Sequence, residues 1–163
     1  MIKIVVISDT HIPERSTEIP KKLLDDLKTA DMIIHAGDLV DISVLETLKK
    51  ICPNVKAVQG NMDHEEVKTI LPEKEVFKIG KYRIGLAHGW GAPSKLIEVL
   101  TTAFENIPVD IIIFGHSHCS VNEKINGILY FNPGSPTDKI FAASNSYGII
   151  EINDKIEAKI IKL

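Results

Sequence analysis

Aspartate, asparagine and histidine side chains recur just after the apolar segments of this chain. The apolar segments at residues 2–7, 32–35 and 55–58 are each followed by such residues, and two later segments show the same pattern. The residues concerned are Asp9, His11, Asp38, Asn61, His88, His116 and His118. Carboxylate and amide oxygens together with imidazole, without thiolate, suit hard-to-intermediate divalent ions. The pattern therefore predicts a metal site.

The spacing of these residues indicates how ions could be shared between them. Asp9 and His11 are separated by one residue, so an extended backbone can direct both side chains at one ion. The carboxylate of Asp38 has two oxygens and can bridge a pair of ions. His116 and His118 lie in a turn after an apolar segment and can diverge toward different ions. We expect two divalent ions per chain, with Mn²⁺ favoured and Ni²⁺, Fe²⁺ or Zn²⁺ as alternatives.

Each of these motifs has an ordinary structural interpretation when it is taken alone. An Asp-x-His pair can cap a helix or form a surface turn, and Gly-Asp and Gly-Asn pairs are common in turns. Several candidates adjoin a glycine, where a tight turn or a close backbone approach is expected. These glycines are Gly37, Gly60, Gly89 and Gly115. The order of the motifs, their position after strands and their complementary ligand types together favour the metal site.

The first half of the chain alternates apolar, β-branched runs with helical periodicity. We expect strands at residues 2–7, 32–35 and 55–58, and helices at 21–28 and 43–50. In the second of these helices, Ser43 and Glu46 have the spacing of a capping box. A β-α-β-α-β order favours a parallel sheet with right-handed crossovers. The carboxyl ends of strands in such a sheet are where ligands bind, which is where the candidates lie.

The second half of the chain predicts a second sheet. Strands at 75–79 and 82–87 flank a hairpin turn at Gly80-Lys81, a helix is expected at 93–104, and a strand is expected at 109–114. Short strands are expected around 126–127 and 153–154. We therefore predict an α/β fold in which two packed mixed sheets are flanked by helices, as an α/β/β/α sandwich. Residues 1–163 are expected to form a single domain.

The charge balance argues against a general nucleic-acid surface. The 163 residues include 19 Lys and Arg against 22 Asp and Glu, which gives a net charge of -3. An anionic substrate would therefore have to be held locally, for example by metal ions. The two cysteines lack a paired spacing, which favours a reducing cytoplasm. The apolar start of the chain is too short for a membrane span, so we expect no membrane association.

Other polar and aromatic residues invite structural interpretations. His35 lies within a predicted strand and is expected to be a hydrogen-bonded core residue. His64 follows Asp63 in a polar loop and is expected to be solvated, with contact to substrate as the alternative. Trp90 is expected to pack against other apolar residues, or to form a wall of the pocket. Cys119 is expected to be a small apolar filler, and residues 132–135 a turn that could line the same edge.

The series of motifs resembles that of the calcineurin-like metallophosphoesterase superfamily. The short length is similar to its small, single-domain YfcE-like phosphodiesterase branch, which includes a relative used as a retromer subunit. The resemblance implies one ion held by Asp9, His11, Asp38 and His118. It implies a second ion held by Asp38, Asn61, His88 and His116. Asp38 and a water or hydroxide would bridge the ions, and Asn61 would also bind substrate.

The chain departs from the family pattern directly after Asn61. Many members have a histidine there that protonates the leaving oxygen or binds the phosphate, whereas this chain has Met62. Thioether sulfur can do neither, so Asp63 and His64 are the candidates for a proton donor. We expect a metal-dependent phosphodiesterase acting on a small phosphate ester, with a protein-interaction scaffold as the alternative. A homo-oligomer is compatible with the sequence, and a mononuclear zinc hydrolase lacks its His-Glu-x-x-His motif.

Overall fold

The apolar strands of the first half form the centre of one mixed sheet. The computed structural model describes residues 1–163, and the first sheet has the order β10-β9-β1-β2-β3. Its strands are β1 (Ile2–Ile7), β2 (Met32–His35), β3 (Val55–Ala57), β9 (Ser146–Ile152) and β10 (Ile156–Lys162). The first three run parallel, as the β-α-β-α-β order predicts, while β9 and β10 extend the sheet antiparallel.

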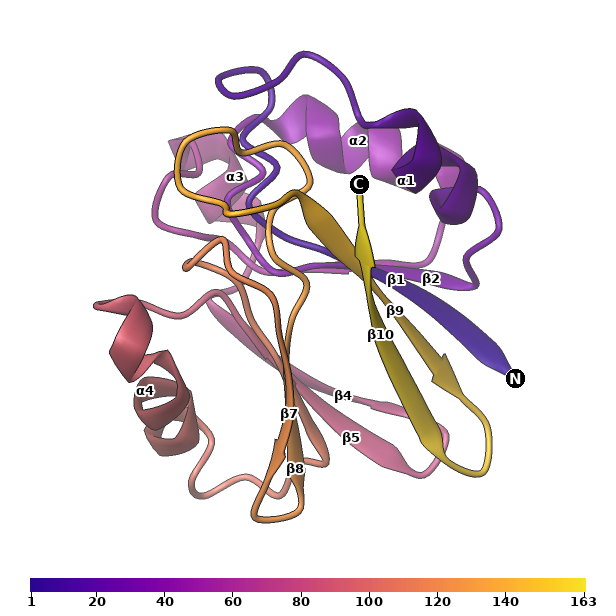
Figure 1. The fold of residues 1–163 in the computed structure, drawn as a ribbon, viewed down its shortest axis with the longest axis vertical. Coiled ribbons are helices and arrows are strands. Elements are labelled where there is room, and N and C mark those ends of the chain that lie inside the picture. The colour runs from indigo at the N-terminus through magenta and orange to yellow at the C-terminus, as the bar shows by residue number, and fades with distance from the viewer.

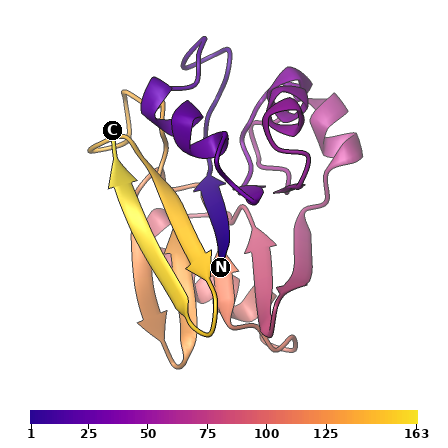
Figure 2. The same cartoon turned by 90° about the vertical axis from the view of Figure 1, so that its right-hand side faces the viewer.

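A second mixed sheet has the order β4-β5-β6-β8-β7. Its strands are β4 (Lys74–Ile79), β5 (Tyr82–Ala87), β6 (Ile111–Ile113), β7 (Val121–Ile125) and β8 (Ile128–Asn132). The central strands β5, β6 and β8 are parallel, and each edge strand joins by an antiparallel hairpin. The two sheets lie face to face in Figure 1, and Figure 2 shows the same layers from the side.

Helices cover the outer face of each sheet (Figure 1). The first sheet is covered by α1 (Lys21–Leu27), α2 (Ile42–Ile51) and α3 (Glu65–Ile70). The second is covered by α4 (Leu96–Ala103), which follows the 3-10 turn η1 (Pro93–Lys95). The predicted α/β/β/α sandwich is therefore confirmed. None of the helices is both long enough and apolar enough to cross a membrane.

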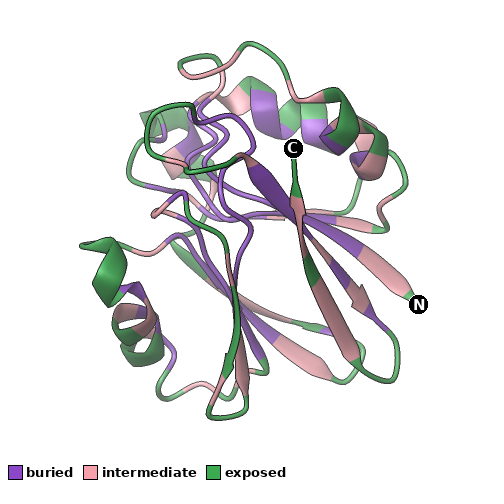
Figure 3. Ribbon diagram, in the orientation of Figure 1, coloured by how far each residue is buried: buried purple, intermediate pink, exposed green.

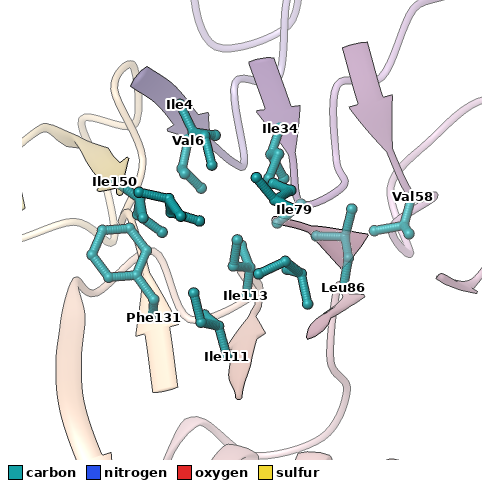
Figure 4. Packing of buried hydrophobic residues seen from close by; sticks show 13 residues of the cluster. Ile4, Val6, Ile34, Val58, Ile79, Leu86, Ile111, Ile113, Phe131 and Ile150 are labelled. Atoms are coloured by element: carbon teal, nitrogen blue, oxygen red, sulfur yellow. The ribbon is translucent and has the colours of Figure 1, made fainter. Parts of the chain in front are cut away.

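The main core lies between the sheets and explains why the buried part of β1, residues 4–7, is apolar at every position. Ile4 and Val6 point into the cluster between the sheets, where Figure 4 shows them facing Ile113 and Phe131 of the second sheet. Val5 and Ile7 point to the opposite face of the sheet and pack under the helices instead. Successive side chains of a strand point to opposite faces, so a strand buried on both faces must be apolar at every position.

One expectation about local structure is wrong, and one short helix was not predicted. The helix α2 begins after Asp41, whose carboxylate accepts a hydrogen bond of 2.9 Å from the Ser43 N–H, so Asp41 is the N-cap and the Ser43–Glu46 capping box does not form. The helix α3 was not predicted, and His64, which was placed in a polar loop, is its N-cap residue. By contrast, the short strands expected around Asn126-Gly127 are present as β7 and β8, and this pair forms the turn between them, with φ angles of 50° and 84°.

Candidate metal centre

The loops after β1, β2, β3, β5 and β6 meet at one edge of the two sheets. Burial continues past the strand ends into these loops, which are purple in Figure 3. The loops carry the predicted residues Asp9, His11, Asp38, Asn61, His88, His116 and His118. Those that are buried are Asp9, His11, Asp38, His88 and His118. His116 is half-buried and Asn61 is exposed. Five strand ends from both sheets therefore build one polar, largely buried cluster.

The backbone at this cluster adopts an unusual conformation. Left-handed φ angles of 54°, 44°, 58°, 70° and 60° occur at Asp9, His11, Asp38, His116 and His118, respectively. Residues other than glycine rarely adopt such angles, and each costs roughly 1–3 kcal/mol. Such residues concentrate at active sites, where the surrounding structure holds them in place. The backbone geometry thus marks five of the seven predicted ligands, and Val40 and Asn126 are the other non-glycine residues with such angles.

Close backbone packing explains two of the glycines that adjoin the cluster. A Cβ atom at Gly60 would lie 2.2 Å from Asp38 Oδ1, and one at Gly115 would lie 1.9 Å from Ser8 Oγ. Neither position has room for a side chain. The expectation that these glycines permit a close approach to the site is confirmed.

Asp9, His11 and His118 form a first group of potential ligands. The His118 Nε2 atom is 3.3 Å from Asp9 Oδ1, and His11 Nε2 is 3.8 Å from the same oxygen. Asp9 Oδ1 and both ring nitrogens of His11 are buried without any hydrogen-bond partner. Buried polar atoms almost always have a partner. Their spacing suits ligands of one ion with bonds of about 2.1 Å, so these residues fit a metal.

Asp38 lies between this first group and a second one. Its Oδ2 atom is 3.5 Å from His11 Nε2 and 3.3 Å from His88 Nε2. Asn61 Oδ1 lies 3.1 Å from His88 Nε2 and 3.3 Å from His116 Nδ1. Asp9 Oδ1 also approaches His88 Nε2, at 3.8 Å, so both carboxylates face both groups. This placement is the one that a bridging carboxylate requires.

Backbone carbonyls orient two of the imidazoles. His88 Nδ1 lies 2.7 Å from the Ala36 carbonyl oxygen, and His116 Nε2 lies 2.9 Å from that of Gly91. A carbonyl oxygen only accepts, so each of these nitrogens carries the proton. The opposite nitrogen, Nε2 of His88 and Nδ1 of His116, faces the cluster and offers a lone pair to a metal when the imidazole is neutral. Histidine ligands of metals are usually fixed in this way.

Asp138 was missed by sequence reasoning and orients a third imidazole. Its carboxylate is hydrogen-bonded to His118 Nδ1, which leaves His118 Nε2 facing Asp9. The same carboxylate accepts hydrogen bonds from the backbone N–H groups of residues 140–142 and lies 3.4 Å from Arg15 Nη1. Burial raises the pKa of Asp138, but His118 and these donors lower it below its usual value. Asp138 is a positioning residue.

The charges in the cluster are mutually dependent. Burial by itself raises the pKa of Asp9, but the charge of His88, with His11 and His118 nearby, lowers it well below its usual value. Burial lowers the pKa of His88, but Asp9 and Asp38 outweigh it and raise the pKa to about 9. Two buried carboxylates side by side require compensating positive charge, which either protonated imidazoles or metal ions can supply.

The two candidate proton donors lie outside this arrangement. Asp63 is buried, and its carboxylate accepts backbone N–H bonds from Asp38 at 3.1 Å, Gly60 at 2.6 Å and Val40 at 2.6 Å. Burial raises the pKa of Asp63. These bonds tie the loops after β2 and β3 together, so its contacts point to a positioning role. The His64 side chain is 54% exposed and approaches only carboxylates on the surface. Proton donation by Asp63 or His64 stays a prediction, because neither side chain contacts the cluster of candidate ligands in a way that supports it.

Two cavities flank the cluster and share Asn61. One, of about 470 Å³, is lined by His11, His118 and Cys119 among others. The second, of about 430 Å³, is lined by His88 and Trp90 among others. Cys119 is exposed there, so its assignment as an apolar filler was wrong. Trp90 is 57% exposed, so it forms a pocket wall and does not pack in the core.

The remaining expectations about residues near the site are confirmed. His35 is buried, accepts a hydrogen bond of 3.2 Å from the Gly37 N–H and lies 3.0 Å from the Thr10 hydroxyl. Burial lowers its pKa to about 4, so it is a neutral core residue. The turn at residues 132–135 lines the same edge, since the Ser135 hydroxyl donates to the Asp9 carbonyl oxygen at 2.7 Å.

Comparison with known proteins places this arrangement in a family. The model of the calcineurin-like phosphoesterase superfamily domain matches residues 2–155. A probable metallophosphoesterase of Methanothermobacter thermautotrophicus is 36% identical over 158 residues, which cover 96% of this chain and 90% of that protein. The matched range includes all the strand ends that carry the cluster.

Solved structures agree with the sequence comparison. An archaeal phosphodiesterase superimposes with a TM-score of 0.79 at 25% identity, covering 99% of this chain and 100% of that one. Vps29 of Entamoeba histolytica, solved in complex with Zn²⁺, superimposes with a TM-score of 0.78 at 29% identity and covers 99% of both chains. The chain therefore belongs to the calcineurin-like phosphoesterase superfamily.

Proposed function

We propose that this protein is a metal-dependent phosphodiesterase with a centre for two divalent ions. The observation that carries the proposal is the set of buried, unpartnered ligand atoms, Asp9 Oδ1 and both ring nitrogens of His11. Of these atoms, His11 Nε2 lies 3.5 Å from the buried Asp38 carboxylate, and Asp9 offers its oxygen to the same group as Asp38 and His88. A buried constellation without partners is unfavourable unless a cation completes it. Membership of a phosphoesterase family supports the same reading.

Each ion would be held by oxygen and imidazole ligands from both sheets. The first ion would be held by Asp9, His11, Asp38 and His118. The second would be held by Asp38, Asn61, His88 and His116. Mn²⁺ is the ion that we favour for this ligand set, with Ni²⁺, Fe²⁺ or Zn²⁺ as alternatives. A bound pair of ions supplies Lewis acidity toward a phosphoryl group and lowers the pKa of water.

The chain itself contributes orientation and substrate contacts. Asn61 stands at the junction of the two cavities, with its Oδ1 atom directed at His88 and His116. Its amide nitrogen is then free to donate to a phosphoryl oxygen, and we propose Asn61 as a substrate-binding residue. Asp138 holds His118 in a single orientation. Such preorganised contacts lower the barrier by fixing geometry before the reaction.

A metal-by-substrate activity matrix tests the proposed function. The protein is stripped with a chelator, reloaded with Mn²⁺, Ni²⁺, Fe²⁺ or Zn²⁺, and assayed on bis(4-nitrophenyl) phosphate and on alkyl phosphate monoesters. We expect no activity without metal, and faster cleavage of the activated diester than of the monoesters. Equal activity on an alkyl monoester would contradict the diester preference. Ion binding without turnover on any substrate would contradict the enzyme itself.

The similarity to Vps29 supports a second candidate function. The fold could serve as a protein-interaction scaffold with little or no turnover, and the Entamoeba Vps29 structure superimposes over nearly its whole length. A scaffold has no need of the residue set described above. This chain keeps every predicted ligand position and places all of them at one edge, which favours the enzyme.

Met62 predicts a steep dependence of rate on the leaving group. The side chain is 47% exposed and lines the cavity beside Asn61, where it cannot deliver a proton. We expect Met62→His to raise activity on poor leaving groups by at most the ~10²–10⁴-fold range of general-acid catalysis, and to flatten the dependence of rate on leaving-group pKa. The measurement is the rate across aryl esters of graded pKa, with Met62→Gln as the control. If the rate of the unchanged protein depends only weakly on leaving-group pKa, another acid already protonates the leaving oxygen.

A further inference from the structure

The two cavities that share Asn61 are built alike. The first contains Arg15 and Phe141, and the second contains Lys68 and Trp90. Their volumes of about 470 and 430 Å³ fall within the range of about 300–1,000 Å³ that is typical of small-molecule sites. Each cavity thus offers one aromatic ring and one cationic side chain beside the candidate metal centre.

Phe141 is placed next to the centre and is largely exposed. Its ring is 6.1 Å from that of His118, and the side chain is 66% exposed. The Arg15 guanidinium carbon lies 5.4 Å from the Phe141 ring centroid, while Arg15 Nη1 approaches Asp138. The ring is therefore held against the site by its neighbours and yet remains accessible.

Trp90 has the corresponding position on the other side. It follows His88-Gly89 directly, and the carbonyl oxygen of Gly91 lies 2.9 Å from His116 Nε2. The loop is thus tied to the centre while the indole stays 57% exposed. Seven large apolar residues of this protein are exposed, and Trp90 and Phe141 are the two aromatic ones. Both of them line the cavities that meet at Asn61.

The charges in the cavities indicate what these rings would contact. Arg15 lies 3.4 Å from a carboxylate oxygen of Asp138. Lys68 Nζ is 3.9 Å from Glu65 Oε1, and the carboxylate of Glu73 lines the same cavity. Neither cavity has an uncompensated positive charge that would select a second phosphate group. An uncharged, planar substituent fits both cavities better, because flat rings stack on exposed aromatic side chains.

We propose that the substrates are phosphodiesters that carry a planar ring on each of the two ester arms, as dinucleoside monophosphates do. This inference rests on the proposed function. The phosphodiester would lie at Asn61, with one ring against Trp90 and the other against Phe141. Hydrolysis adds one water: a new P–O bond forms, one ester P–O bond breaks, and the departing oxygen takes a proton. The products are one alcohol and one phosphate monoester, each with its ring.

Substrates that differ in a single arm test the inference. Bis(4-nitrophenyl) phosphate and methyl 4-nitrophenyl phosphate share a leaving group, but only the first has two rings. We expect Trp90→Ala and Phe141→Ala each to lower kcat/KM for the two-ring ester by about 5- to 150-fold, the range for loss of one stacked base. For the methyl ester, only one of the two variants should reduce kcat/KM. Ile140→Ala, which removes an exposed apolar side chain outside both cavities, is the control.

Fluorescence gives a second readout that does not depend on turnover. Trp90 is the single tryptophan of the chain, so its emission reports on its own cavity. We expect adenosine 5′-monophosphate to quench this emission in the Zn²⁺-loaded protein, while ribose 5-phosphate leaves it unchanged. Hydrolysis of both esters with no effect of either variant would overturn the inference and leave the proposed function standing. If no ester is hydrolysed with any metal, the proposed function fails. In that case, an equal change of Trp90 emission with adenosine 5′-monophosphate and with ribose 5-phosphate would overturn ring binding as well.

Discussion

An Asp38→Asn variant should lose at least about 10⁴-fold in kcat/KM with saturating metal, the equivalent of about 5 kcal/mol of barrier. The Asp38 Oδ2 atom lies between His11 and His88, at 3.5 and 3.3 Å from their Nε2 atoms. Its Oδ1 atom accepts a hydrogen bond of 2.8 Å from the Met62 N–H. Asparagine keeps the size and this acceptor but removes the charge that would bridge two ions. The measurement is steady-state kinetics on an aryl diester.

A matched control separates this effect from a general loss of charge. Asp110 also accepts a backbone hydrogen bond through its carboxylate, from the Arg83 N–H at 2.7 Å, and lies away from the centre. Asp110→Asn should change kcat/KM by less than about two-fold, since surface substitutions seldom perturb a remote site. Circular dichroism should show both variants folded. A folded Asp38→Asn protein with near-normal turnover would refute the bridging role.

Loading the metal-free protein should raise its stability by about 5 kcal/mol, which is about 2.7 kcal/mol for each of two sites at 100 times Kd. For a chain of this size the midpoint of thermal unfolding should then rise by roughly 10–20 °C. The reason is that Asp9 Oδ1 and the His11 ring nitrogens are buried without partners. Calorimetry with and without metal measures the shift, and elemental analysis measures the stoichiometry.

Two histidine variants calibrate that experiment. His118→Ala removes a proposed ligand of the first ion and should reduce the stoichiometry from two ions to one. His64→Ala removes an exposed histidine outside the cluster and should leave two ions bound. One ion per chain in the unchanged protein at saturating metal, or an unchanged unfolding midpoint, would rule out the two-ion centre.

The layout of the strands and of the site could be predicted from the sequence because both depend on strong, local patterns. Strands buried on two faces read as continuous apolar runs, and polar residues next to glycine mark where such runs end. The short helix α3 could not be found in this way. Its six residues bury only Val67, so it shows no helical periodicity. Its stability comes from Val67, which packs into the core cluster between the first sheet and its helices.

Residues that act through another side chain were the harder part of the site to predict. Asp138 reaches His118 across 20 positions from the long loop after β8, and no spacing rule connects the two. Asp41 and Ser43 are both acceptable N-caps, and only the backbone geometry of the structure shows that Asp41 is used. Asp63 looked chemically available until its carboxylate was found to accept three backbone hydrogen bonds.

The left-handed backbone of the cluster has a consequence for how such a chain can evolve. Glycine would adopt the φ angles of Asp9, His11, Asp38, His116 and His118 with less strain, so each of these side chains is a burden on the folded state. A descendant kept only for its shape would gain stability by discarding them. Random drift should therefore erode this edge first. Retention of this edge in related chains is therefore expected only where its chemistry is used.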